Sequence, residues 1–227
     1  MRKRLAYSVS ALAAMVLGCT CASAQVPALT PDLATIAVGS AWSVYNATAE
    51  SVQVDGRQAA RLVATGDSAN GIVGLALANG VAFTTGTIEV DLKGKDVRGR
   101  SFLGVAFNVA GEKAFEGVYF RPFNFKADEP FRGRAVQYIA WPAYTWEKLR
   151  RERTGEFEAP IRPLPDPNGW FHVRVEVAND RVRVFVDRAL EPCLTTTRLA
   201  QAHGRAVGLF VDSADGMYAN LRITPDR

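Results

Sequence analysis

Cysteine and histidine are scarce in this chain. Its 227 residues include only two histidines, His172 and His203, and three cysteines. So few side chains of these types give no zinc-type ligand cluster. Cys19 and Cys21 lie in an N-terminal segment that we expect to be removed, and Cys193 alone has no internal disulfide partner. The stability of the folded chain must therefore come from its apolar core.

The sequence also lacks a hydrophobic run long enough to cross a membrane. The apolar run at residues 5–18 is too short for a membrane-spanning helix. Basic residues precede it (RKR at 2–4), and the small-residue motif ASA at 22–24 follows it. This order predicts that residues 1–24 are a secretory signal peptide, so we expect export to the periplasm or beyond. The residues before Cys19 resemble a lipoprotein box, and a lipid anchor on Cys19 is the alternative.

The net charge is small once that segment is removed. The whole chain has 27 basic and 23 acidic residues, and three of the basic ones stand at positions 2–4. A mature chain so nearly balanced has no electrostatic footprint for nucleic acid. The roughly 200 residues that remain suit one domain with a sizeable core. We therefore expect residues 25–227 to form a single domain, and the protein to be a monomer.

Long helical patterns are also absent, and short alternating runs take their place. These runs are rich in β-branched residues and are separated by Gly, Pro, Asn and Asp, as in all-β sandwiches and barrels. Residues 170–177 and 182–187 give the strongest hairpin pattern, with one buried and one wetter face. The expected strands are 41–47, 59–65, 71–78, 86–93, 101–109, 115–121, 134–141, 170–177, 182–187, 206–211 and 218–223.

The predicted core and the single predicted helix follow from the same patterns. Period-two alternation assigns to the core Ile88, Val90, Leu92, Val105, Phe107, Val173, Val175, Val184 and Leu209. The one helix is expected at residues 144–152 (YTWEKLRRE), with Thr145 as its cap. A helix of about nine residues does not hold in isolation. Trp146 and Leu149 are the side chains expected to anchor it.

Several of these runs carry a family resemblance. The hairpin WFHVRVEVANDRVRVFVD (170–187) and the strand GTIEVDLK (86–93) resemble laminin-G-like domains of the concanavalin A-like lectin/glucanase superfamily. The pair GVYFR (117–121) and AVQYI (135–139) resembles its secreted 3-keto-disaccharide hydrolase-like branch. The resemblance implies an all-β, two-sheet antiparallel jelly-roll sandwich. It leaves the function open, because this fold hosts lectins, hydrolases, lyases and adhesion modules.

One feature of that superfamily is incomplete in this sequence. Family-16-type glucanases carry their catalytic carboxylates in an E-x-D-x-x-E strand, and residues 89–94 read EVDLKG, with Gly94 in the third position. A retaining mechanism needs two carboxyl groups about 5 Å apart. We therefore reject this mechanism and interpret Glu89 and Asp91 as part of a solvated strand face.

Residues 115–150 are the best candidate for a ligand site. They combine aromatic rings with Arg, Asn and Gln, the mixture of flat apolar surfaces and planar hydrogen-bonding groups that suits a sugar. Strand alternation pairs Tyr119 with Arg121 and Gln137 with Trp141 on their respective strand faces. The predicted ligand-binding residues are Tyr119, Arg121, Asn124, Gln137, Trp141, Trp146 and Arg150.

Each of these residues also has a structural interpretation. Tyr119 and Trp141 would then belong to the core, and Arg121 would pair with Asp128 or Glu129. No catalytic residue can be named. The nearest acids are Glu116, predicted to face the other side of its strand, and Glu156 and Glu158, interpreted as a solvated loop. His172 is interpreted as a solvated strand residue.

We predict a secreted carbohydrate-binding domain that uses the face built by residues 115–150. One alternative is a glycoside hydrolase or lyase of the keto-sugar type on the same face, which would bring two acid/base groups into one pocket. The other is a cell-envelope interaction module, which would present a broad apolar patch instead. No cofactor or metal is expected. Calcium at Asp212 and Asp215 was the one candidate, and a turn explains those residues equally well.

Overall fold

The computed structural model describes residues 27–66, 70–199 and 204–226. The predicted signal peptide, Cys19 and His203 lie outside the described residues. Within the described part of the chain, no helix is long and apolar enough to cross a membrane.

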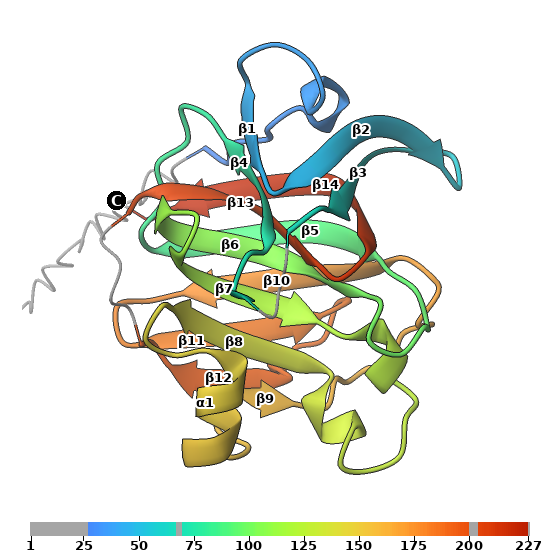
Figure 1. The fold of residues 1–227 in the computed structure, drawn as a ribbon, viewed down its shortest axis with the longest axis vertical. Coiled ribbons are helices and arrows are strands. Elements are labelled where there is room, and N and C mark those ends of the chain that lie inside the picture. The colour runs from blue at the N-terminus through green and yellow to red at the C-terminus, as the bar shows by residue number, and fades with distance from the viewer. Residues whose placement is uncertain (1–26, 67–69, 200–203, 227) are drawn as a thin grey trace, which may run out of the picture.

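Two seven-stranded antiparallel sheets form the molecule, and Figure 1 shows them stacked as two layers. The first sheet comprises, in spatial order, β1 (Trp42–Tyr45), β4 (Gly74–Ala78), β13 (Ala206–Asp212), β6 (Phe102–Gly111), β7 (Ala114–Phe120), β8 (Val136–Trp141) and β9 (Glu158–Ala159). The second comprises β12 (Leu194–Thr197), β11 (Arg181–Val186), β10 (Phe171–Val177), β5 (Gly86–Lys93), β14 (Asp215–Pro225), β3 (Arg57–Ala64) and β2 (Ala47–Val54). The predicted all-β sandwich is confirmed.

The core lies between the two sheets. All nine predicted core residues are at most 1% exposed, so the alternation was interpreted correctly. Aromatic contacts cross the interface, as where Phe120 of β7 meets Phe171 of β10 edge to face at 5.4 Å. Fully burying an aliphatic or aromatic side chain contributes about 1.5–3 kcal/mol. Burial on this scale lets the fold dispense with disulfides.

The strands at the N-terminal end differ from the prediction. Residues 41–47 were expected to form one strand, but the chain passes from β1 in the first sheet to β2 in the second at Asn46, whose φ is +52°. We missed β2 because each of its residues is exposed or only half-buried, which leaves no clear apolar face. Its hairpin with β3 does have a sequence signal: Asp55 and Gly56 both have positive φ, as a two-residue β-hairpin turn requires.

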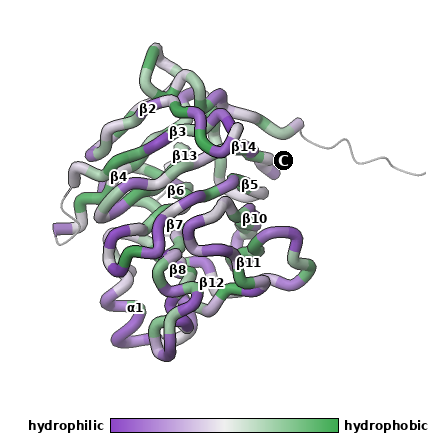
Figure 2. The backbone as a smooth tube through the Cα atoms, turned by 90° about the vertical axis from the view of Figure 1, so that its right-hand side faces the viewer, coloured by the Kyte–Doolittle hydropathy of each residue, from purple (hydrophilic) through white to green (hydrophobic). Residues whose placement is uncertain are grey.

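The predicted helix is confirmed as α1 (Trp146–Glu152). The Thr145 side chain caps it by accepting a hydrogen bond from the backbone N–H of Lys148. Leu149 is buried and anchors the helix, while Trp146 remains 38% exposed. In the side view of Figure 2, α1 is largely hydrophilic and lies at the opposite end of the molecule from β2. Three short 3-10 helices complete the described elements: η1 (Leu33–Thr35), η3 (Pro122–Asn124) and η4 (Arg132–Arg134).

Candidate functional site

Antiparallel pairing of β7 with β8 builds the floor of a candidate site. Their register places Tyr119 directly opposite Gln137, and Arg121 follows at the end of β7. The Arg121 guanidinium donates hydrogen bonds to the Tyr119 hydroxyl at 2.7 Å, to Gln137 Oε1 at 2.5 Å and to the Arg134 carbonyl at 2.8 Å. The Tyr119 hydroxyl in turn donates to Gln137 Oε1 at 3.3 Å. These side chains are therefore fixed by one another.

This floor is buried, and burial sets the ionisation of its groups. Arg121 is 4% exposed, and burial lowers the pKa of its guanidinium. Burial also raises the pKa of Tyr119 to about 12, so its hydroxyl stays protonated and remains a donor at neutral pH. Among the residues that the structure describes, Glu158 has the carboxylate nearest to Arg121, and its Oε2 lies 4.0 Å from Arg121 Nη1.

Glu158 is shared among several arginines. Arg150 Nη2 lies 2.7 Å from Glu158 Oε2, and Arg150 Nε donates to both carboxylate oxygens. Arg134 Nε lies 3.7 Å from Glu158 Oε1. The interpretation of Glu158 as a solvated loop residue is therefore wrong. Its side chain is 6% exposed because β9 pairs with β8 and draws the carboxylate under the arginines.

A cleft of about 490 Å³ opens above this floor, and we call it the Arg121 cleft. Its walls carry five aromatic residues, Phe102, Tyr119, Phe123, Phe131 and Trp146. Guanidinium groups lie against these rings: Arg98 is 4.0 Å from the Phe131 centroid, and Arg150 is 4.8 Å from the Trp146 ring. Stacking of this kind holds a charged group in place at the mouth of a cleft.

The structure brings most of the predicted ligand-binding residues together. Tyr119, Arg121, Asn124, Trp146 and Arg150 line the Arg121 cleft. Gln137 lies beneath them, fully buried. The structural alternative for Arg121 does not hold, because its contacts are those of the floor described above.

Trp141 does not belong to the cleft. It lies on the outward face of β8 with Gln137, but four residues along a strand are about 13 Å. There its ring stacks on Phe115, with centroids 6.4 Å apart and an interplanar angle of 7°. A Cβ placed on Gly71 would come within 2.3 Å of the same ring, so the chain passes close over Trp141. Strand alternation predicted its face correctly but did not fix its position along the strand.

The sequence reasoning missed several residues of the cleft. Arg98 precedes β6, and Phe102 opens that strand. By strand alternation Phe102 shares a face with Gly104 and Ala106, whose small size leaves room over the sheet. Strand alternation could therefore have placed Phe102 in the site. The approach of Asp212 from β13 depends instead on the strand order, which the sequence does not reveal.

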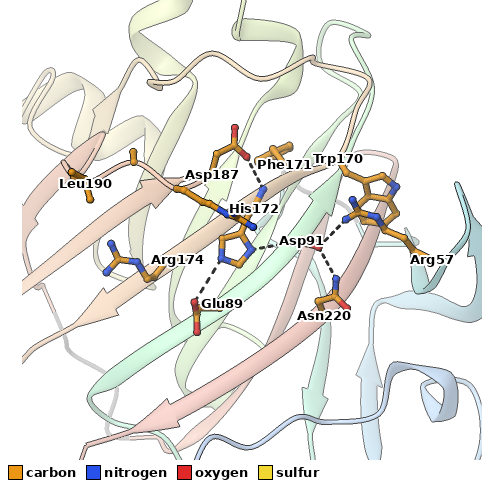
Figure 3. Close-up of a pocket in the computed structure, with 12 residues that line it drawn as sticks. Arg57, Glu89, Asp91, Trp170, Phe171, His172, Arg174, Asp187, Leu190 and Asn220 are labelled. Atoms are coloured by element: carbon orange, nitrogen blue, oxygen red, sulfur yellow. Dashed lines mark hydrogen bonds and ion pairs between the residues drawn. The ribbon is translucent and has the colours of Figure 1, made fainter.

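A second cavity, of about 920 Å³, opens on the outer face of the second sheet, and we call it the His172 groove (Figure 3). His172 lies between two carboxylates there. Its Nδ1 is 2.8 Å from Asp91 Oδ1, and its Nε2 is 3.7 Å from Glu89 Oε1. Asp91 Oδ2 also accepts hydrogen bonds from Arg57 at 2.8 Å and Asn220 at 2.7 Å. Asp91 is therefore a buried hub of hydrogen bonds, and its interpretation as solvated is wrong.

These contacts make stability depend on pH. The hydrogen bond to Asp91 raises the pKa of His172 above 6.5. Burial alone would raise the pKa of Asp91, but hydrogen bonds from His172 and Asn220 hold it below its usual value. The contribution of protonated His172 to the free energy of unfolding is fully present below about pH 6.5. It is lost as the pH rises through the raised pKa that His172 has in the folded state. The contribution of the ionised Asp91 carboxylate to the free energy of unfolding is present above about pH 3.9. It is lost as the pH falls through the lowered pKa that Asp91 has in the folded state.

We expect the wild type to be more stable than His172→Gln at about pH 6, and the difference to shrink as the pH rises towards about 9. Thermal melts of both proteins across this range measure it. Glutamine keeps a hydrogen-bonding group but cannot take up a proton. A difference that stays constant with pH would contradict the assignment.

The two residues considered for calcium are engaged in other contacts. Both oxygens of Asp215 are engaged by cations, Arg61 Nε at 3.0 Å and Lys95 Nζ at 2.7 Å. Asp212 instead lines the Arg121 cleft and accepts a hydrogen bond from Ser213. In the described ranges, no group of three or more His, Cys, Asp or Glu side chains is arranged to hold a metal ion.

No protein-family model matches the sequence, and no curated protein does. Solved structures do share the fold. The carbohydrate binding module CBM66 from Bacillus subtilis matches with a TM-score of 0.54 and 17% identity, over 80% of this chain and 94% of that one. A Bacillus subtilis protein of unknown function with a galectin-like fold gives 0.51 and 12%, over 81% and 88%.

The VIP36 exoplasmic/lumenal domain, in its form bound to Ca²⁺ and Man3GlcNAc, gives a TM-score of 0.50 and 13% identity, over 82% of this chain and 84% of that one. At such identities the likeness concerns the fold. The chain shares its two-sheet β-sandwich fold with these structures, and this is the fold that the sequence resemblance implied.

Proposed function

We propose that this protein binds a saccharide in the Arg121 cleft. The observation that carries the proposal is the combination of aromatic walls with a fixed polar floor. A pyranose ring has apolar faces that stack on rings such as Trp146 and Phe102, and hydroxyls that need well-placed partners. Arg121 and Asn124 supply such partners from buried, oriented side chains.

The structural neighbours support a saccharide as the ligand class. One is described as a carbohydrate binding module, and another was solved with the oligosaccharide Man3GlcNAc bound. We further propose that the protein meets its ligand outside the cytoplasm, because residues 1–24 have the features of a signal peptide.

Binding without bond cleavage fits the cleft better than hydrolysis. Glycoside hydrolysis uses two carboxyl groups, one of them placed to donate a proton. Glu158 accepts three hydrogen bonds from Arg150, and this leaves it poorly placed to exchange protons with a substrate. Glu158 lies beneath the cleft, and the acids that line it among the described residues are Glu147, which is exposed, and Asp212.

Trp146→Ala tests the proposal. Loss of ring stacking should weaken saccharide binding about tenfold, which corresponds to about 1.4 kcal/mol. The melting temperature should change little, because Leu149 rather than Trp146 anchors α1. A glycan array identifies bound saccharides, and titration calorimetry then measures the affinities.

Tyr45→Ala is the matched control. Tyr45 is 37% exposed against 38% for Trp146, and it lies on β1, away from the cleft. This variant should bind as the wild type does. Equal losses in the two variants, or no saccharide bound by the wild type, would contradict the proposed function.

A further inference from the structure

The Arg121 cleft holds more positive than negative charge. Four arginines line it: Arg98, Arg121, Arg134 and Arg150. Arg121, Arg134 and Arg150 share a single carboxylate, Glu158. Arg98 forms an ion pair with no acidic residue in the described part of the chain, and its guanidinium rests on the Phe131 ring. Among the described residues, one positive charge remains in excess even when the two acids of the lining, Glu147 and Asp212, are counted with Glu158.

The positive charge with the weakest compensation lies at the floor of the cleft, on Arg121. Its hydrogen bonds to described residues go to neutral oxygens. Within that part of the chain, the one carboxylate in ion-pair range, that of Glu158, is 4.0 Å away and already bound to Arg150. A cation withdrawn from water without a close anion costs free energy. Such an arrangement is expected where an anionic ligand completes the charge balance.

The floor also has an unused donor. Gln137 Nε2 is the one buried side-chain nitrogen or oxygen without a hydrogen-bond partner among the residues that the structure describes. The orientation of this amide is fixed, because Gln137 Oε1 accepts from both Arg121 and Tyr119. The unsatisfied buried polar atom beneath the cleft is therefore a donor, which an anion could accept from, rather than an acceptor.

We propose that the ligand of the Arg121 cleft is a carboxylated saccharide, one that carries a uronic acid or a sialic acid. This inference rests on the proposed function and specifies it. A planar carboxylate matches the two-pronged geometry of a guanidinium group, which a sugar hydroxyl does not. Arg98 provides such a group at the mouth. Arg121, whose Nη atoms are held by the floor, adds its positive charge from below. The aromatic walls take the ring that bears the carboxylate.

The test compares each acidic saccharide with its own methyl ester. The ester keeps every ring and hydroxyl of the ligand and removes only the negative charge. The probes are oligogalacturonate, oligoglucuronate and sialyllactose, each titrated into the purified protein beside its ester. We expect at least one acid to bind tenfold or more tightly than its ester, and the preference to fall as the salt concentration rises.

Two variants localise the effect. Arg98→Gln should weaken binding of the acid about three- to tenfold and narrow the preference for the acid over its ester, because the charge at the mouth is lost. Arg100→Gln removes the same charge two residues away, from an exposed side chain that does not line the cleft, and should change neither.

The outcomes separate this inference from the proposed function. Equal binding of acids and esters, or binding of neutral saccharides alone, would overturn the charge assignment and leave saccharide binding in place. Competition by acetate or sulfate at the same concentration as the acidic saccharide would indicate a general anion site and overturn the inference. Failure of every acidic, esterified and neutral saccharide to bind would overturn both.

Discussion

Arg121→Met should leave the protein at least as stable as the wild type while saccharide binding falls a hundredfold or more. Methionine has nearly the reach of the arginine stem and fills the same buried space without a charge. Replacing a buried ion by an apolar side chain of similar volume is often neutral or stabilising by about 1–4 kcal/mol. For a domain of this size, such a gain would raise the melting temperature by several degrees.

No buried acceptor is orphaned by this substitution. The Arg134 carbonyl keeps its hydrogen bond from Asn124 Nδ2 at 3.2 Å, and Gln137 Oε1 keeps the one from the Tyr119 hydroxyl. Glu158 keeps Arg150, its closest partner. Binding suffers because each charge-assisted hydrogen bond contributes about 1.5–3 kcal/mol, and two such bonds are worth at least a hundredfold in affinity.

Calorimetric melting and ligand titration on the same preparations measure the two effects. Arg121→Lys is the comparison variant: it keeps the charge but loses the planar fork, so it should retain an intermediate affinity. If Arg121→Met melts well below the wild type, Arg121 is a structural residue. The cleft would then lose its strongest candidate for ligand recognition.

Glu116→Ala should destabilise the protein by about 3–5 kcal/mol. Glu116 is fully buried between the sheets, where it accepts hydrogen bonds from Arg198, from the Tyr138 hydroxyl at 2.6 Å and from Asn108 Nδ2 at 2.8 Å. Arg198 follows β12 of the second sheet, so this ion pair joins one sheet to the other. Removing the Glu116 carboxylate leaves the Arg198 guanidinium, whose side chain is only 7% exposed, without its counter-charge.

The double variant Glu116→Leu/Arg198→Met should recover most of this loss. Removing both charges leaves no unpaired ion, and the apolar replacements fill the space. Urea unfolding of the wild type, the single variant and the double variant provides the comparison. A loss below about 1 kcal/mol for Glu116→Ala, or a double variant no better than the single one, would show that the pair contributes little.

The sequence predicted the interior of the sandwich well and its polar chemistry poorly. Residues such as Val90 and Val175 are buried because period-two alternation leaves them no other face. The same rule correctly directed Glu116 to the face opposite Tyr119. It could not reveal that this face is the core, or that Arg198, distant in sequence, supplies the partner charge.

The candidate site shows the same limit. Tyr119 and Arg121 are neighbours on one strand, and their shared face follows from local geometry. Arg98 and Asp212 reach the cleft from other segments of the chain, and Glu158 reaches the arginines beneath it. Their positions depend on strand order and loop path. Glu158 was misjudged because a Gly- and Pro-flanked stretch resembles a solvated loop, and a two-residue strand such as β9 leaves almost no pattern.

The Arg121 cleft and the His172 groove open on opposite outer faces of the sandwich, with both sheets and the core between them. Sheets pack about 10 Å apart, and substitutions separated by more than about 7–10 Å that share no partner usually have additive effects. The two sites have no lining residue in common. A change on one outer face therefore leaves the contacts of the other in place, so the two faces can evolve, or be engineered, independently.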